Sequence, residues 1–511
     1  MKIINSLKIL LLVLLTHSTV IKAANGEWYR NGYPGSPWNN IVESCEGICN
    51  AFNPPRGVKT CNISQTHVDG TPAAVQAFCD PNGGGLQVYH DICLPGTTYN
   101  PQTQQCEIQK NRGNCKVGSC CLGNPIHGGT GNKYQTETDI TLTSLSFSRT
   151  YNSTEFYLNG TLVSTVLGNH WNHVFERYVI VDTLNPNAAH VTRPDGKSYL
   201  FTMSGIQWIP DADVEDQLEQ FTDGQGVPTG WRYTTTDNTV EDYNASGKLL
   251  SIIDVRGNLQ TLSYDTSNRL DRVDTNSGEF LQFNYDTSGR MATITDQATR
   301  TWTYRYDANN NLEFVDNPDG TTKQYHYNEP AFTSTTNLPH ALTGITDERG
   351  LRYATFEYQA DGRAKATYHA GNAQRVDITY DDISGSRTVT NSLNQPSTYS
   401  TAVQLGVALV TDVSGPGCAT CGTGNTSYDY NPANNNLLSR TENGITTKFN
   451  NYDSKGQFSC KVEGITSTDT STGVCTFDPV ASPEARRTDY TYDSRFFNKT
   501  TTVTAPSVFS P

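Results

Sequence analysis

A 21-residue period runs through the middle of this chain and constrains its fold more than any other feature. Five pairs of Tyr with Asp or Asn recur at that spacing: Tyr243-Asn244, Tyr264-Asp265, Tyr285-Asp286, Tyr306-Asp307 and Tyr327-Asn328. Other columns keep the same interval, among them Lys248, Arg269, Arg290 and Asn311, and the apolar positions Ile252, Val273, Ile294 and Val315. A fixed period of this kind predicts an array of stacked units, none of which buries a core alone.

Each unit reads as two short strands joined by tight turns. Residues 247–254 and 259–264 predict strands, and 255–258 and 265–268 predict turns. We expect Gly to supply positive φ, the Asp or Asn after each Tyr to bond the turn backbone, and the Tyr ring to pack. After residue 330 the period loosens, with insertions expected at about 328–342 and 391–427. Later members are Tyr452-Asp453 and Tyr492-Asp493.

The composition agrees with an all-β protein. The chain has 511 residues, of which 27 are Tyr and 18 are Phe, and no long helical run is visible. This length exceeds that of one ordinary domain. The net charge is −14 and Lys and Arg are not clustered, which argues against nucleic acid as a partner.

The first 23 residues read as a signal peptide. Lys2 and Lys8 supply positive charge, residues 9–15 form an apolar stretch, and residues 21–23 suit cleavage. The stretch is too short to span a bilayer, and no other segment reaches the required length, so we expect no membrane span in the mature chain. The predicted location is therefore secreted or at the cell surface.

Cysteines concentrate in residues 24–122, which predicts a small disulfide-rich module in an exported chain. The disulfide candidates there are Cys45, Cys49, Cys61, Cys79, Cys93, Cys106, Cys115, Cys120 and Cys121. Nine is an odd number, so one thiol is free, pairs between chains, or pairs with the distal cysteines Cys418, Cys421, Cys460 and Cys475. The irregular spacing does not favour zinc.

Residues 123–240 change in character. The run from Ile140 to Tyr151 alternates apolar and polar residues, which predicts a half-buried strand. The segment 193–196, Arg-Pro-Asp-Gly, predicts a turn before the strand that holds Tyr199, Leu200 and Phe201.

Residues 123–495 resemble the Rhs or YD-repeat family, which includes bacterial polymorphic toxins, the B and C parts of insecticidal Tc toxins, and teneurins. The resemblance rests on the repeats and on segments in front of them: 123–126 with 131–133, 137–139, 145–153, 168–171 with 175–177, and 193–196. It implies an extended, spiralling antiparallel β-sheet that forms a shell around a toxic C-terminal domain. The family's self-cleaving Asp-Pro-x-Gly-Leu motif is missing, since Asp80-Pro81 and Asp478-Pro479 lack the Gly-Leu. We therefore expect a partial shell, truncated before the core and toxin domains.

A fainter resemblance covers residues 93–107, which look like the end of a peritrophin-type chitin-binding module. It supports a second hypothesis, a cell-surface adhesin or carbohydrate-binding protein that uses the cysteine-rich head. The aromatic residues Trp28, Tyr29, Trp38 and Tyr89 would favour this hypothesis, because such rings stack on sugars. The glycosylation sequons at Asn62, Asn152 and Asn159 are relevant only in a source that glycosylates.

Several constellations invite a chemical interpretation, yet we propose no catalytic residue, metal ligand or cofactor. His170 and His173 would point to opposite faces of a strand, which spoils shared metal ligation with Glu176. The segment that begins at Asp307 imitates a calcium loop but has Leu312 where that loop requires Gly. Cys418 and Cys421 form a single C-x-x-C, for which a disulfide is the preferred interpretation over a redox pair or a metal site. Neither a Gly-x-Ser-x-Gly elbow nor a P-loop is present.

The sequence thus predicts five regions: a signal peptide (1–23), a cysteine-rich module (24–122), a β module in front of the repeats (123–240), YD repeats (241–495) and a tail (496–511). The first functional hypothesis is an exported scaffold, the shell-forming part of a secreted polymorphic toxin without its own effector domain. Its partners would be a toxin or the remaining shell segment. The alternative hypothesis adds a surface saccharide as partner.

Overall fold

The computed structural model describes residues 110–113, 121–154, 165–182, 185–381, 384–416, 424–496 and 500–502 in full, and residues 60–64, 73–78, 85–90, 97–100, 105–108, 157–158, 161–162 and 503–504 as backbone strands. The chain divides into two compact units. The first comprises Met1–Ile108 with Tyr157–Thr161, and the second comprises Gln109–Phe156 with Leu162–Pro511.

The described part of the first unit consists of short antiparallel strands. Three of them form a sheet, β1 (Thr60–Ser64), β2 (Ala73–Phe78) and β3 (Gly85–His90), and two more form a hairpin, β4 (Thr97–Asn100) and β5 (Gln105–Ile108). A further two-stranded sheet joins β10 (Tyr157–Leu158) and β11 (Thr161–Leu162).

The second unit is dominated by one antiparallel sheet of 28 strands in sequence order, β13 to β40. The strands before residue 328 are β13 (Tyr178–Val181), β14 (Ala188–Thr192), β15 (Ser198–Ser204), β16 (Gln207–Pro210), β17 (Gln217–Thr222), β18 (Pro228–Thr234), β19 (Val240–Asn244), β20 (Leu249–Ile253), β21 (Leu259–Tyr264), β22 (Leu270–Thr275), β23 (Phe280–Tyr285), β24 (Met291–Asp296), β25 (Thr301–Tyr306), β26 (Leu312–Asp316) and β27 (Thr322–Tyr327). The first repeat tyrosine, Tyr243, lies in β19. After an irregular segment at 328–341 follow β28 (Leu342–Thr346), β29 (Arg352–Tyr358), β30 (Ala364–His369), the 3-10 turn η1 (Ala370–Asn372), β31 (Ala373–Asp381), β32 (Ser386–Thr390), β33 (Pro396–Gln404), β34 (Val407–Ser414), β35 (Thr426–Tyr430), β36 (Leu437–Glu442), β37 (Ile445–Tyr452), β38 (Phe458–Thr466), β39 (Arg486–Tyr492) and β40 (Thr500–Thr504). The predicted all-β class with an extended antiparallel sheet is confirmed.

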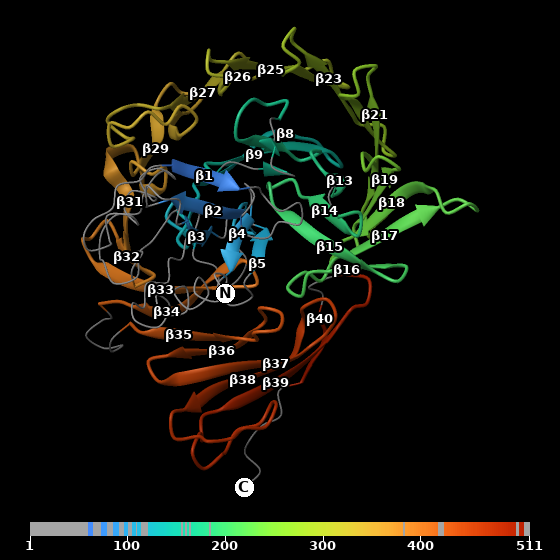
Figure 1. The fold of residues 1–511 in the computed structure, drawn as a ribbon. Coiled ribbons are helices and arrows are strands. Elements are labelled where there is room, and N and C mark those ends of the chain that lie inside the picture. Colours follow the sequence, from blue (N-terminus) through green and yellow to red (C-terminus); the bar gives the residue numbers. More distant parts are fainter. Residues whose placement is uncertain are drawn as a thin grey trace, which may run out of the picture. The chain divides into compact units, whose positions relative to one another are not determined.

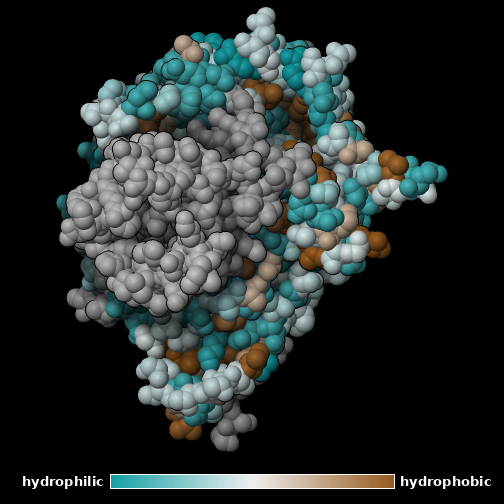
Figure 2. Space-filling model, in the orientation of Figure 1, coloured by the Kyte–Doolittle hydropathy of each residue, from teal (hydrophilic) through white to brown (hydrophobic). Residues whose placement is uncertain are grey.

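The two faces of this sheet differ because side chains alternate along each strand. In β22, Leu270 and Val273 are buried, whereas Asp274 lies on the other face opposite Thr261 of β21. Figure 2 shows that the outward side of the arc formed by the repeat strands is mostly hydrophilic. The apolar face is therefore the inner one.

A break in register accompanies most of the repeat tyrosines. The pairing shifts immediately before Tyr243, Tyr264, Tyr285, Tyr306, Tyr327, Tyr358, Tyr430 and Tyr492. Each shift places an extra residue on one strand, as in a β-bulge, which bends the strand and increases the local twist. Because the bulge recurs with the repeat, the sheet curves steadily, and Figure 1 shows it as an arc.

A small inner sheet lies inside this arc (Figure 1). Its strands are β8 (Tyr134–Thr141), β9 (Ser146–Asn152) and β12 (Trp171–His173), with β9 in the middle. A short hairpin, β6 (Cys121–Leu122) with β7 (Ile126–His127), precedes it. The alternating run 140–151, interpreted from the sequence as one strand, is divided between β8 and β9 by a turn at 142–145, where Leu142 N–H bonds the Leu145 carbonyl.

Two long-range contacts fasten the curve of the large sheet. The Val179 N–H of β13 donates to Gly247 O at 2.9 Å, so the first strand meets the turn between β19 and β20. Further on, Lys455 Nζ lies 2.8 Å from Asn238 Oδ1, and Asn238 Nδ2 donates to the Arg495 carbonyl. The turns near 455 and 495 therefore meet the turn between β18 and β19.

The two predicted insertions differ in outcome. Residues 328–341 form an irregular segment between β27 and β28. The interruption expected at 391–427 is wrong for most of its length, because residues 396–414 form β33 and β34 and continue the sheet. The turn predicted at 193–196 is present: Arg193 N–H bonds Lys197 O, and Gly196 N–H bonds Arg193 O.

Candidate functional site: the inner face of the long sheet

The aspartate after each repeat tyrosine holds a turn together. Oδ1 of Asp265 accepts the N–H groups of Ser267 at 2.9 Å and Arg269 at 2.8 Å, and Oδ2 accepts Arg269 Nε at 2.9 Å. Asp286, Asp307 and Asp453 bond the turn N–H groups two and four residues ahead in the same way. Asp493 accepts from Arg495 and Phe496 instead. These carboxylates accept hydrogen bonds from the N–H groups of their own turns. The segment at Asp307, which imitates a calcium loop in sequence, is therefore a repeat turn in which the carboxylate supports the backbone.

The tyrosine hydroxyls form a second ladder across the sheet. Each donates to the carbonyl 15 residues upstream: Tyr264 to Leu249, Tyr285 to Leu270, Tyr306 to Met291, Tyr327 to Leu312 and Tyr452 to Leu437, at 2.6–2.8 Å. Tyr492 reaches Phe458 O, 34 residues upstream, because a long segment separates β38 from β39. Tyr243 departs from this pattern, since its hydroxyl bonds the carboxylate of Glu241.

A cation column links consecutive repeats, and the sequence reasoning missed its role. The guanidinium of Arg269 lies 4.4 Å from the ring centre of Tyr285, and that of Arg290 lies 4.5 Å from Tyr306. Lys248 sits 4.2 Å from the Tyr264 ring. The signal was present as the basic column at 248, 269 and 290, four residues after each Asn or Asp. Such contacts add about 0.5–1 kcal/mol each at exposed positions.

The inner sheet docks on these repeats through a buried ion pair. Arg149 of β9 is fully buried, and its Nε and Nη2 donate to Asp139 at 2.6 and 2.8 Å. Nη2 also reaches the hydroxyl of Tyr325 at 2.7 Å, while Asp139 accepts from Tyr304 at 2.9 Å. Burial disfavours the charge on Arg149, but Asp139 outweighs it and raises the pKa of the guanidinium well above its usual range. The two sheets thus share one polar cluster inside an apolar core.

Aromatic packing surrounds that cluster. The ring centre of Phe147 lies 5.9 Å from that of Phe283 on β23 and 6.2 Å from that of Tyr304 on β25. Both strands belong to the long sheet, which we call the wall. Trp171 packs edge-on against Tyr325 at 5.2 Å, under the guanidinium of Arg149 at 4.7 Å. The inner face of the repeats is therefore occupied by side chains of β9 and β12 along this part of the arc.

A second buried ion cluster joins Arg177 just before β13, Arg193 just after β14 and Glu241 in β19. Glu241 is fully buried, and Arg193 bonds both of its oxygens at 2.7 Å, with Arg177 and the Tyr243 hydroxyl as further donors. Burial alone would raise the pKa of this carboxyl, but Arg193 and Arg177 lower it to about 2. The cluster binds three segments of the chain into one rigid corner.

His170, His173 and Glu176 occupy separate surroundings rather than one metal site. His170 Nδ1 lies 2.8 Å from Asn152 O, and its ring packs near His340. His173 packs against Phe147, and burial lowers its pKa to about 3, so its 4.0 Å contact with Glu176 is not an ion pair. Among the residues described in full, no group of three or more His, Cys, Asp and Glu side chains is arranged to hold a metal.

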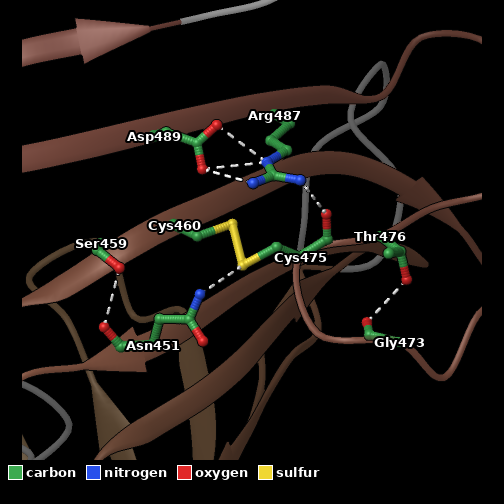
Figure 3. The surroundings of a disulfide bond; sticks show 8 residues. All are labelled: Asn451, Ser459, Cys460, Gly473, Cys475, Thr476, Arg487 and Asp489. Atoms are coloured by element: carbon green, nitrogen blue, oxygen red, sulfur yellow. Dashed lines mark hydrogen bonds and ion pairs between the residues drawn. A yellow bond between two sulfur atoms is a disulfide. The ribbon is translucent and has the colours of Figure 1, made fainter.

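Of the thirteen cysteines, Cys460 and Cys475 form a disulfide with Cα atoms 6.1 Å apart (Figure 3). Both are buried, and the bond anchors the segment between β38 and β39. Cys121 is also disulfide-bonded. Cys61 and Cys106 lie in β1 and β5, where only the backbone is described. The remaining predicted disulfide candidates, Cys45, Cys49, Cys79, Cys93, Cys115, Cys120, Cys418 and Cys421, lie outside the described residues.

Two other features of the sequence have a place in the structure. Asn152, a predicted sequon, is fully buried, and its side chain bonds Asn132, Gly113 N–H and Asp195 O. Nowhere in the described ranges does a helix have the length and apolar character needed to cross a membrane.

Comparison with known proteins gives two family matches. Residues 123–201 match a domain of unknown function, DUF6531, and residues 285–322 match the RHS repeat. No match is found among curated proteins.

Among solved structures, the crystal structure of TcdB2-TccC3-TEV is 11% identical over 88% of this chain and 25% of that chain, with a TM-score of 0.34. The crystal structure of TcdB2-TccC3-Cdc42 is 11% identical over 86% of this chain and 26% of that chain, with a TM-score of 0.35. This chain spans about a quarter of the length of those chains. With TM-scores this low, neither likeness carries an argument about fold or function. The RHS-repeat match falls on two of the 21-residue units whose Tyr and Asp columns build the long sheet, so these units are similar to RHS repeats.

Proposed function

We propose that this protein is an exported scaffold that forms part of the wall of a shell around a toxin, and that residues 1–511 supply no effector activity of their own. The observation that carries the proposal is the division of the long sheet into two faces. Apolar side chains such as Val273 and Ile294 point inward, and polar ones such as Asp274 and Thr293 point outward. A curved wall with this division separates an interior from water.

The buried clusters support a mechanical role for the polar residues. Arg149 with Asp139, and Arg193 with Glu241, join segments that are far apart in the sequence. The repeat aspartates and tyrosines bond their own turns and neighbouring strands. We therefore assign these groups to holding the wall in shape, and we propose the remaining shell segment or a toxin as the partner.

Export and enclosure are tested separately. Residues 1–23 fused to a reporter that is active only outside the cytoplasm should give activity, and deletion of residues 9–15 from the fusion should abolish it. For enclosure, the full chain is co-expressed with the polypeptide encoded next to it. We expect the two to co-purify and the partner to resist protease until the chain is denatured.

Expression of the 511-residue chain alone in a susceptible host tests the effector claim. Normal growth is expected, while growth arrest by the folded chain would overturn the claim. The alternative, an adhesin that uses the cysteine-rich head, stays a prediction, because the head's side chains at 24–109 and 114–120 lie outside the described residues.

A further inference from the structure

The strands β33, β34, β35 and β36 lie next to one another in the long sheet and line a depression near one of their ends. β34 pairs with β33 along its whole length, from Ser414 opposite Thr398 to Val407 opposite Gln404. With β35, however, it pairs only at Asp412–Ser427 and Val413–Thr426. A depression of about 510 Å³ lies at this point, a size typical of small-ligand sites.

One row of polar side chains crosses the depression. Ser400 of β33 pairs with Asp412 of β34, Asp412 with Ser427 of β35, and Ser427 with Thr441 of β36. Side chains of opposed residues share a face, so these four groups form a line across four strands. At a strand spacing of about 4.8 Å the line is roughly 14 Å long. The alternate residues Tyr399, Val413 and Tyr428 pack against the core on the other face, so the row is turned away from the interior.

The chemistry of the row excludes most ligand classes. Hydroxyl groups both donate and accept hydrogen bonds, and Thr398 and Ser414 add two more at the edge of the depression. Asp412 is exposed, is the one charged group among the lining residues that the structure describes, and repels phosphate and other anions. Its two oxygens can accept two neighbouring hydroxyl groups of one ligand. A neutral molecule with many hydroxyl groups satisfies every group in the row.

We propose that this depression, lined by Ser400, Asp412, Ser427 and Thr441, binds a neutral oligosaccharide. Asp412 accepts hydrogen bonds from a vicinal diol, and the serine and threonine hydroxyls bond the flanking sugar rings. The site is on the outward face of β33–β36 and is distinct from the cysteine-rich head. It does not depend on the shell function, since an outward surface is available whether or not the wall encloses a toxin.

The test measures binding of cellotriose, maltotriose and chitotriose to the full-length protein by saturation-transfer NMR and calorimetry, with sialyllactose as an anionic comparison. We expect at least one neutral trisaccharide to bind. In Asp412→Ala and in Ser427→Ala its Kd should rise about tenfold, because each variant removes hydrogen-bonding groups from the row.

Thr261→Ala is the matched control, since Thr261 is an exposed residue on the outward face of β21. It should bind as the parent does, and all three variants should keep the parent melting temperature. Ser427→Ala alone decides the result if Asp412→Ala fails to fold. Absence of binding of every neutral trisaccharide at about 10 mM would overturn the proposal. Binding that survives both row variants, or a preference for sialyllactose, would overturn it as well.

Discussion

The indole Nε1 of Trp171 donates a hydrogen bond to the hydroxyl of Tyr327, 2.8 Å away, and that hydroxyl donates in turn to Leu312 O. Trp171 belongs to the inner sheet and Tyr327 to the hydroxyl ladder of the wall. A repeat tyrosine therefore serves both its own sheet and the docking of another.

Trp171→Phe removes this donor and keeps an aromatic ring. We expect the free energy of unfolding in urea to fall by about 1 kcal/mol more than for Trp302→Phe. Trp302 is a comparable control because it is also buried on the inner face and packs against Arg300. Equal losses in the two variants would show that the hydrogen bond adds nothing to docking.

Glu176 makes stability depend on pH. Burial raises the pKa of its carboxyl from 4.5 to about 7, against the opposing hydrogen bond from His173 N–H. Because the folded state holds this proton more tightly than the unfolded state, the contribution is complete below about pH 4.5 and is lost as pH rises to about 7. Glu176→Gln should therefore gain up to about 3 kcal/mol over the parent above pH 7 in urea unfolding at several pH values.

Glu279→Gln is the control for this titration. Burial opposes the charge on Glu279, but hydrogen bonds from Ser144 outweigh it and lower the pKa of the carboxyl. Its effect should have the opposite sign, a loss of stability that is largest at neutral pH. A Glu176→Gln variant whose pH profile parallels that of the parent would refute the assignment.

Glu241→Gln should be among the most destabilising single changes in the wall. The substitution leaves Arg193 and Arg177 buried without their carboxylate, which costs about 3–5 kcal/mol. The half-exposed pair of Arg232 with Asp242 is the comparison, and Asp242→Asn should cost less than about 1 kcal/mol. Thermal unfolding of both variants checks the ranking, and equal costs would contradict it.

Gly247 is required by two independent constraints. Its φ is +76°, and a Cβ there would lie 1.7 Å from Val179 O. Val179 belongs to β13, and its N–H donates a hydrogen bond to the Gly247 carbonyl. Gly257 shares the positive φ but has open space around it. Gly257→Ala should cost about 1 kcal/mol from backbone conformation alone. Gly247→Ala should cost more, and hydrogen exchange should show that β13 has lost protection; a β13 that stays protected would contradict the argument.

The disulfide between Cys460 and Cys475 should hold its segment against local opening. Cys475→Ser removes a cross-link whose closed loop of 15 residues is expected to contribute about 3 kcal/mol. Limited proteolysis should then cut within 467–485, where Val474 and Val480 are exposed, before it cuts elsewhere. Val480→Ser, which leaves the cross-link intact, should resist cleavage as the parent does.

The sequence predicted what is local and repeated. The period of Tyr264, Tyr285 and Tyr306 yields strands and turns because each unit presents the same pattern of apolar residues, Gly and Asp to its neighbours. It could not predict that Arg149 reaches Tyr325, 176 residues away, since no repeat column marks which unit receives the inner sheet. The same holds for Asn238 and Arg495. Tyr243 shares the sequence signature, yet its hydroxyl bonds the carboxylate of Glu241 rather than a carbonyl 15 residues upstream. Arg177 and Arg193 hold that carboxylate close to the Tyr243 hydroxyl.

The bulge that precedes most repeat tyrosines has a consequence for the number of repeats. Each register shift before a repeat tyrosine bends the sheet and so adds to its curvature. Insertion or deletion of one unit between β19 and β37 would therefore rotate Lys455 and Arg495 away from Asn238 together. Single substitutions in the turns leave the number of bulges unchanged, whereas a change in copy number alters the total curvature of the sheet. The contacts that Asn238 makes with Lys455 and Arg495 therefore depend on the number of repeats between them.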